Sequence, residues 1–98
     1  MKKIVAITAC PTGIAHTYMA AEKLEQAAKK RGYQIKVETQ GSMGVENEIS
    51  QTEANDADVV IFAADIAVSN RERFAEPKII EVSVHEVLKN CDTLFDRI

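Results

Sequence analysis

The chain has 98 residues, 46% of them hydrophobic and 28% charged, which is an ordinary balance for one folded domain. Its formal net charge of −3 argues against nucleic acid as the main partner. No apolar run approaches the roughly 20 residues that span a bilayer, and the Lys2-Lys3 start lacks a signal-peptide core. We therefore expect no direct insertion into a membrane.

Two apolar runs, at residues 4–9 and 59–64, predict central parallel strands that are covered on both faces. The alternating run 35–39 and the shorter, mixed run 78–82 predict peripheral strands. Between the first two strands the sequence predicts a helix over about 14–31, ended by a glycine cap. Its predicted buried stripe consists of Ala20, Leu24, Ala27 and Ala28.

Three Ser-x-x-Glu patterns predict further helix starts. They are Ser50/Glu53, Ser69/Glu72 and Ser83/Glu86. The resulting alternation of strands and helices favours a parallel sheet with right-handed crossovers. We predict an α/β fold of three layers, with a four-stranded parallel sheet and helices on both faces in a Rossmann-like or flavodoxin-like topology. Residues 1–98 form one predicted domain, in which 92–98 are a docked last turn or the start of a tether.

The two cysteines lie near opposite ends of the chain. Structural disulfides are typical of smaller, cysteine-dense secreted chains, so we expect two free thiols in a reducing, cytoplasmic compartment. Cys91, near the end of the last predicted helix, is interpreted as a packing residue. No spacing of His and Cys resembles a zinc site, and we predict neither a metal nor a cofactor.

The most informative stretch follows the first predicted strand, at the edge where parallel sheets bind ligands. Cys10 ends this strand and a tight Pro/Gly loop leads into the helix. Exposed amides of such a loop and of a helix N-terminus hold phosphate and favour thiolate over thiol. We interpret Cys10 as the acceptor of a phosphoryl group. The predicted phosphate-binding residues are Pro11, Thr12, Gly13, Ile14, Ala15, His16 and Thr17.

This loop is similar to the Cys-x5-Arg-Ser/Thr loop of protein tyrosine phosphatases, with His16 in place of the arginine. That arginine clamps two phosphate oxygens, so its loss slows attack by water while leaving room for a phosphothiol. His16 can donate to a phosphate oxygen or share a proton. Two plainer readings stay open: His16 makes only a local hydrogen bond, and Cys10 is a small buried hydrophobe.

Three motifs together resemble the fructose-type IIB domain of the bacterial phosphoenolpyruvate-dependent sugar phosphotransferase system. The first covers residues 8–22, TACPTGIAHTYMAAE. The second covers 38–48 and includes ETQGS, and the third combines 63–65 with 70–74. This resemblance extends over nearly the whole chain.

The resemblance implies a protein-phosphocysteine–sugar phosphotransferase. Cys10 receives a phosphoryl group from a phosphohistidine on a IIA partner and delivers it to a fructose-type sugar held by the membrane IIC transporter. The domain is then a cytoplasmic bacterial protein, peripheral to the inner membrane through IIC, and either a free subunit or a piece of a fused chain. Residues predicted to face the partner are Met19, Gln40, Gly41, Ser42 and Met43, with Arg71 or Arg73 added only if the fold brings them near.

Two other classes of function use a similar loop. A cysteine-based phosphatase or arsenate reductase is the main alternative, and a non-catalytic module for anionic ligands is the other. The His16-for-arginine exchange argues against a phosphatase. A reductase needs a resolving cysteine nearby, whereas Cys91 is remote in sequence.

Overall fold

The computed structural model describes residues 2–9, 14–41, 44–74 and 78–97, with the side chains of residues 14 and 15 excepted. In chain order the elements are β1 (Lys3–Ala9), α1 (Ile14–Lys30), β2 (Gln34–Gly41), β3 (Gly44–Glu46), α2 (Gln51–Asp56), β4 (Val59–Ala64), the 3-10 helix η1 (Arg71–Arg73), β5 (Ile79–Val82) and α3 (Val84–Asp96). The predicted elements are confirmed, and their ends differ by only a residue or two.

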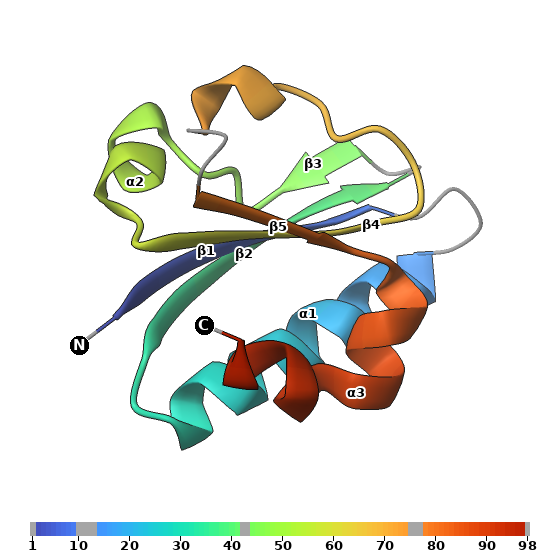
Figure 1. The fold of residues 1–98 in the computed structure, drawn as a ribbon. Helices are drawn as coiled ribbons and strands as arrows, with labels where there is room; N and C mark the ends of the chain where they lie inside the picture. Colours follow the sequence, from blue (N-terminus) through green and yellow to red (C-terminus); the bar gives the residue numbers. More distant parts are fainter. Residues whose placement is uncertain (1, 10–13, 42–43, 75–77, 98) are drawn as a thin grey trace.

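The strands form one sheet in the order β3-β2-β1-β4-β5. β2, β1, β4 and β5 are parallel neighbours, whereas β3 pairs antiparallel with β2. Helices α1 and α3 cover one face, and α2 and η1 lie over the other (Figure 1). The α/β class and the four parallel strands are confirmed. The strand count and the peripheral place of β2 were wrong, because the short hairpin strand β3 covers the outer edge of β2.

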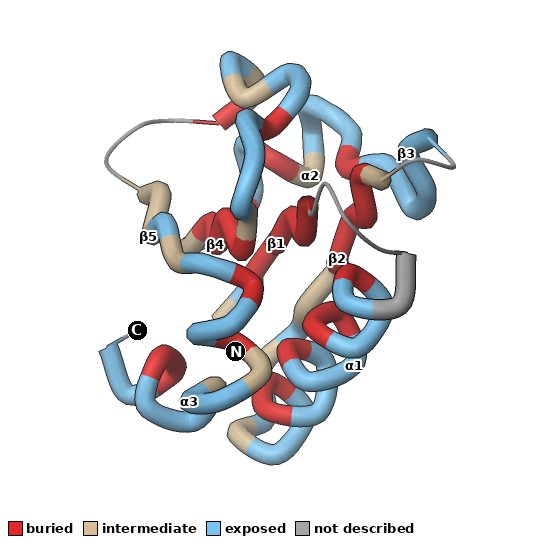
Figure 2. The backbone as a smooth tube through the Cα atoms, turned by 90° about the vertical axis from the view of Figure 1, so that its right-hand side faces the viewer, coloured by how far each residue is buried: buried red, intermediate tan, exposed pale blue. Residues whose placement is uncertain are grey.

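Burial follows the alternation of side chains along the central strands. Ile4 and Ala6 of β1 pack on the side of α1 and α3, whereas Val5 and Ile7 pack on the side of α2 and η1. The predicted helix stripe is fully inside, since Ala20, Leu24, Ala27 and Ala28 all belong to the first of these two clusters. Figure 2 shows the buried residues concentrated in the central strands and on the inner side of α1.

Local capping explains where several helices begin and end. Ser50 and Glu53 form a complete capping box at the start of α2, as predicted. At α3 the Ser83 hydroxyl accepts from the amide of Glu86 at 3.0 Å. Gly32 follows α1 with a φ of 74°, a left-handed conformation that glycine adopts without strain.

The third predicted capping box, Ser69/Glu72, was wrong. The N-cap of η1 is Asn70, with a φ of 57° and no side-chain capping bond. The backbone of Ser69 is instead engaged by the side chain of Gln40 from β2. A tertiary contact therefore replaces the local one that the spacing suggested.

The last helix packs on the rest of the domain, while the alternative that 92–98 begin a tether stays a prediction. α3 continues to Asp96, and Leu94 and Phe95 are each 1% exposed. Arg31, after α1, forms an ion pair with Asp96 at 2.8 Å. Among the described helices, none combines the length and the apolar character that crossing a membrane requires.

Candidate functional site

The carboxyl ends of the central strands meet at one edge of the sheet. Ala9, the last residue of β1, lies in register between Gln40 of β2 and Ala64 of β4. The amide of Asp65 donates to the Ala9 carbonyl at 2.9 Å, and the Asp65 Oδ1 accepts from the amide of Val84 at 3.3 Å. Asp65 thus links the end of β1 to the start of α3.

The predicted acceptor lies outside the described residues. Cys10, Pro11, Thr12 and Gly13 fall there, and the side chains of Ile14 and Ala15 are likewise not described. In sequence Cys10 directly follows Ala9, and α1 starts at Ile14. The roles of these six residues in binding phosphate therefore stay predictions.

The first turn of α1 is fixed on β1 by two buried threonines. The Thr8 hydroxyl donates to the Thr17 carbonyl at 3.2 Å, and Thr17 is 2% exposed. Thr8 belongs to the motif but had no predicted role, and the structure shows that it anchors the helix start. α1 carries no acidic residue in its first turn, so the positive end of its dipole is left for an anion.

The two histidines of the chain come together at this edge. His16 is exposed in the first turn of α1, and the ring of His85, from the first turn of α3, lies 6.4 Å away between centroids. The planes of the two rings are inclined by 55°. Two groups that can donate to an anion therefore stand beside each other at the starts of two helices.

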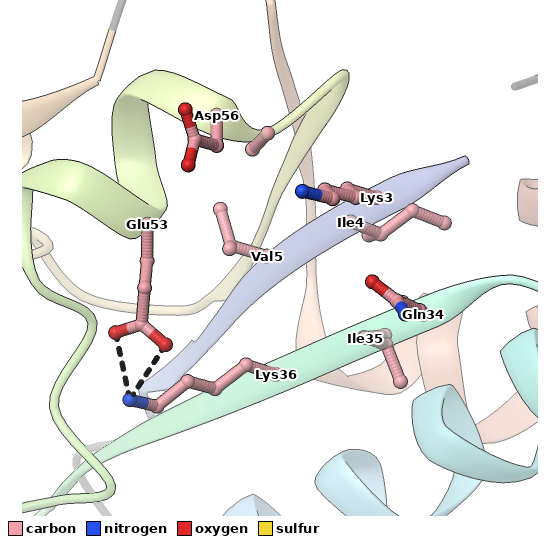
Figure 3. Close-up of a pocket in the computed structure, with 9 residues that line it drawn as sticks. Lys3, Ile4, Val5, Gln34, Ile35, Lys36, Glu53 and Asp56 are labelled. Atoms are coloured by element: carbon pink, nitrogen blue, oxygen red, sulfur yellow. Dashed lines mark hydrogen bonds and ion pairs between the residues drawn. The ribbon is translucent and has the colours of Figure 1, made fainter. Parts of the chain in front are cut away.

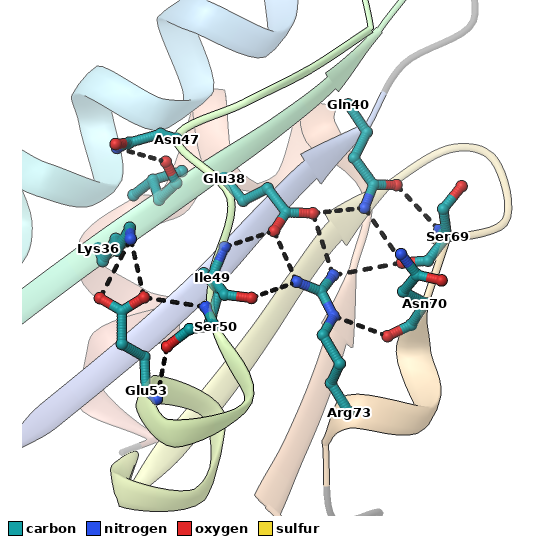
Figure 4. A network of polar contacts seen from close by, with 11 residues as sticks. Lys36, Glu38, Gln40, Asn47, Ile49, Ser50, Glu53, Ser69, Asn70 and Arg73 are labelled. Carbon is teal, nitrogen blue, oxygen red and sulfur yellow. Dashed lines mark hydrogen bonds and ion pairs between the residues drawn. The ribbon is translucent and has the colours of Figure 1, made fainter.

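A dense polar network occupies the end of β2 (Figure 4). Glu38 is 1% exposed, and its carboxylate accepts two bonds from Arg73, at 2.8 and 3.1 Å. It also accepts from the backbone N–H of Ile49 at 2.8 Å and from the side-chain Nε2 of Gln40 at 2.6 Å. Burial alone raises the pKa of Glu38, but these donors outweigh it and hold the pKa below the usual value. Hydrogen bonding to Glu38 in turn raises the pKa of Arg73.

Gln40 was predicted to face the partner, but the structure places it inside, at 7% exposed. Its Oε1 accepts from the Ser69 amide at 2.9 Å, and its Nε2 donates to the Ser69 carbonyl at 3.2 Å. Gln40 therefore holds the segment after β4 and offers no surface of its own.

The other residues predicted to face a partner differ in how far they are exposed and in whether they are already paired. Met19 is 50% exposed and Gly41 is half-buried, while Ser42 and Met43 lie outside the described residues. Arg73 is turned to Glu38, and Arg71 forms an ion pair with Glu81 at 3.6 Å. Met19 and Gly41 thus remain the described candidates for contact, and that role stays a prediction.

A separate groove of about 490 Å³ lies toward the amino ends of β1 and β2 (Figure 3). Lys3 and Gln34, near the first residues of these strands, line it, and Lys36 and Glu53 form an ion pair at 2.8 Å on its wall. Parallel strands place the groove away from the carboxyl edge that Cys10 follows. The groove is therefore no part of the candidate site.

Comparison with known proteins consistently gives a IIB component of the sugar phosphotransferase system, although the sugar in the name of the family model differs from that in the names of the relatives. The family model described as "PTS system, Lactose/Cellobiose specific IIB subunit" matches residues 5–97. The "PTS system fructose-like EIIB component 2" of Escherichia coli K12 is 50% identical over 98 residues, which cover 100% of this chain and 92% of the relative. A "PTS system fructose-specific EIIB'BC component" of Xanthomonas campestris is 67% identical over 96 residues, but this chain spans only 16% of it.

Solved structures agree. A domain of the fructose-specific IIABC component of Borrelia burgdorferi superposes with a TM-score of 0.92 at 46% identity, over 98% of this chain and 91% of that one. A predicted fructose-specific IIB of Escherichia coli gives 0.94 at 35% identity, over 100% of this chain and 87% of that one. The chain belongs to the fructose-type IIB family of the bacterial sugar phosphotransferase system. It is accordingly a phosphotransferase component that takes part in sugar phosphorylation.

Sequence reasoning missed two features of this IIB domain. The pairing of His16 with His85 depends on how α1 and α3 pack, and neither residue has a local pattern that signals the other. The Glu38–Arg73 pair joins residues far apart in the chain. Only the third motif, which brings residues 70–74 into the resemblance, hinted that Arg73 has a place near the site.

Proposed function

We propose that Cys10 of this IIB domain accepts a phosphoryl group from a phosphohistidine on a IIA partner and passes it to a fructose-type sugar. The observation that carries the proposal is the position of Cys10 in the chain. It directly follows the last residue of the central strand β1 and precedes α1, whose first turn has no acidic residue. A thiolate at such a place is favoured, and so is a bound phosphate.

The transfer proceeds in two displacements. The Cys10 thiolate attacks phosphorus and forms an S–P bond, while the N–P bond breaks and its electron pair returns to the donor histidine. A sugar hydroxyl then attacks phosphorus and releases its proton to water, while the S–P bond breaks and its electron pair returns to the Cys10 sulfur as thiolate. The leaving group of the second step is a good one because a thiolate is stabilised in these surroundings.

His16 supports the phosphothiol without promoting its hydrolysis. It is exposed at the start of α1, where an imidazole can donate one hydrogen bond to a phosphate oxygen. A single donor lacks the two-pronged grip of an arginine on the transferring group. The phosphoryl group is therefore held until a better acceptor than water arrives.

The acceptor of the second step is a sugar bound by a membrane IIC transporter. A relative of Escherichia coli is named "Fructose-like PTS system EIIBC component", and this chain is 53% identical to a part that makes up 20% of it. We infer the same arrangement here, with the domain at the cytoplasmic side of the inner membrane through IIC. In this proposal the sugar is bound by IIC and not by this domain.

One experiment tests the proposal. The protein is incubated with a phosphorylated IIA domain, and its intact mass is measured before and after alkylation of thiols, with unphosphorylated IIA as the control. We expect a stable gain of one phosphate that blocks alkylation at Cys10 and leaves Cys91 reactive. Turnover to free phosphate without a stable adduct would instead support a hydrolase, and a labelled histidine would refute the acceptor.

A further inference from the structure

His85 is held at the candidate site by the contacts that anchor the start of α3. The first residue of α3 is Val84, whose amide donates to Asp65 Oδ1 at 3.3 Å. The Asp65 amide in turn donates to the Ala9 carbonyl at 2.9 Å. Val84 is 2% exposed, so the residue beside His85 is fixed in the core. The start of α3 is thereby tied to the strand end that Cys10 follows in sequence.

The rings of His16 and His85 are close, but they are too far apart to bond to each other. Their centroids are 6.4 Å apart, whereas two imidazoles joined by one hydrogen bond of about 2.9 Å have centroids at most about 5.2 Å apart. Within the part of the chain that the structure describes, no hydrogen bond engages either ring, and both residues are exposed. A gap with an imidazole on each side therefore lies between the starts of α1 and α3.

The width of this gap fits an oxygen atom of an anion better than a metal ion. An oxygen that accepts from an imidazole at about 2.8 Å lies about 4 Å from the ring centroid, so two rings can share it at separations up to about 8 Å. A zinc ion bound at about 2.1 Å lies only about 3.2 Å from each centroid. Rings 6.4 Å apart would then have to face each other in a straight line across the metal, whereas zinc sites are tetrahedral.

The inclination of the rings also suits a shared acceptor. An imidazole N–H donates in the plane of its ring, so an oxygen bonded to both rings has to lie close to both planes. Planes inclined by 55° intersect, whereas stacked parallel rings would have no such common position. Each neutral imidazole has one N–H to donate, so the pair can hold an oxygen without either ring being charged.

We propose that His85 is a second phosphoryl-binding residue, which together with His16 holds one oxygen of the phosphoryl group carried by Cys10. This inference rests on the proposed function. Donors from two helices restrict the orientation of the group more than a single donor does. Positioning of the transferring group is a large part of catalysis in phosphoryl transfer.

The first test observes the ring of His85 directly by NMR, before and after phosphorylation by IIA. An exposed ring N–H exchanges rapidly with water, and a hydrogen bond slows this exchange. We expect a ring N–H proton of His85 to become observable in the phosphorylated protein, together with one of His16. Cys10→Ser treated with the same phosphorylated IIA is the control and should show neither signal. A His85 ring that is unchanged while Cys10 carries phosphate overturns the inference.

The second test measures the half-life of the phosphorylated protein in two variants of His85. His85→Leu removes the donor, and we expect the half-life to fall about threefold. His85→Gln keeps an N–H donor and should stay within about 1.5-fold of the parent. Lys89→Leu removes another exposed donor, one turn further along α3, and is the matched control that should leave the half-life unchanged.

The outcomes separate this inference from the proposed function. If the parent takes no phosphate on Cys10, the proposed function fails and the inference falls with it. If the parent does take phosphate and His85→Leu has the half-life of the parent, the inference fails alone. An equal fall in His85→Leu and His85→Gln also overturns it, because the donor would then not be what matters.

Discussion

Two regions flank the end of β1, and they are built in opposite ways. At the start of α1, His16 is exposed, and the helix is anchored by the buried Thr8–Thr17 bond. At the end of β2, Glu38 is closed in and accepts from Arg73, Gln40 and the Ile49 amide. The first region exposes the His16 imidazole, and the second joins its polar groups to one another.

Under the proposed function, this difference divides the tasks of the site between the two regions. Groups that meet a transient phosphoryl group have to stay unpaired in the resting protein, since a partner already bound would have to be displaced. Groups that hold the surrounding segments in place are most effective when each is fully bonded. We therefore expect changes in the first region to affect transfer and changes in the second to affect stability.

The largest effect should come from Cys10→Ser. An alkoxide is a far poorer nucleophile and leaving group than a thiolate at neutral pH, while the change in volume is small. Phosphoryl acceptance should be abolished with the unfolding curve unchanged. The matched control is Cys91→Ser, because Cys91 is half-buried and its Sγ donates to the Lys23 carbonyl at 3.5 Å. Intact-mass measurements with phosphorylated IIA decide the matter, and an inactive but folded Cys91→Ser would revive a two-cysteine redox mechanism.

The second effect concerns stability in the closed region. Glu38→Ala leaves the guanidinium of Arg73, whose side chain is 11% exposed, without its carboxylate, so the free energy of unfolding should fall by about 3–5 kcal/mol. The double change Glu38→Met with Arg73→Met removes both charges and should fall much less. Urea denaturation of parent, single and double variants measures the difference. A single variant as stable as the double one would mean that the carbonyls of Ile49, Ser69 and Asn70, to which Arg73 also donates, are enough to hold its charge.

The sequence predicted the parts of the molecule whose signals are local. Residues 4–9 and the helix from 14 were recognisable because a central strand and an amphipathic helix carry their burial in their own periodicity. β3 was missed because Gly44–Glu46 is a short, exposed hairpin strand without an apolar pattern. Alternation in 35–39 suggested a peripheral strand, whereas β2 has neighbours on both sides and its Glu38 is bonded to Arg73.

For the candidate site, the sequence predicts a cysteine loop because residue types at fixed spacing carry its chemistry, and the role of that loop stays a prediction. The place of Gln40 and the meeting of His16 with His85 could not be predicted, because they depend on the packing of distant elements. A buried amide and an exposed one have the same letter in a sequence.

The third effect tests the open region at His16. His16→Ala should still accept phosphate, but the loss of one hydrogen bond to a charged group costs about 1.5–3 kcal/mol, a factor of roughly ten or more in phosphothiol lifetime or transfer rate. His85→Ala is the neighbouring control, and we expect a smaller change because His85 comes from the other helix. Decay of the phosphorylated protein and its transfer rate are measured for each. Equal loss in both variants would show that the histidines act as a unit.

A second substitution at His16 restores the arginine of the phosphatase loop and complements that experiment. His16→Arg makes two-pronged binding of the transferring group possible, yet it should give at most weak hydrolysis. A phosphatase also needs a general acid for the leaving group, and Asp65, at the same edge of the sheet, has its Oδ1 bonded to the Val84 amide. Release of free phosphate from an aryl phosphate is the measurement. Brisk hydrolysis by the unmodified protein would contradict the idea that the loop holds phosphate rather than yielding it to water.

The smallest effect is a dependence of stability on pH that belongs to the closed region. Because the pKa of Glu38 is lower in the folded protein than in the unfolded chain, the unfolded chain binds the additional proton as the solution becomes acidic. The stabilisation is complete above the ordinary glutamate pKa of about 4.3 and is lost as the pH falls through the lower, folded value.

Glu38→Gln cannot titrate, so its free energy of unfolding should fall less steeply over this range. Urea denaturation of both proteins between neutral and acidic pH measures the two slopes. Parallel slopes for parent and Glu38→Gln would mean that the Arg73 pair is not what makes this region sensitive to acid.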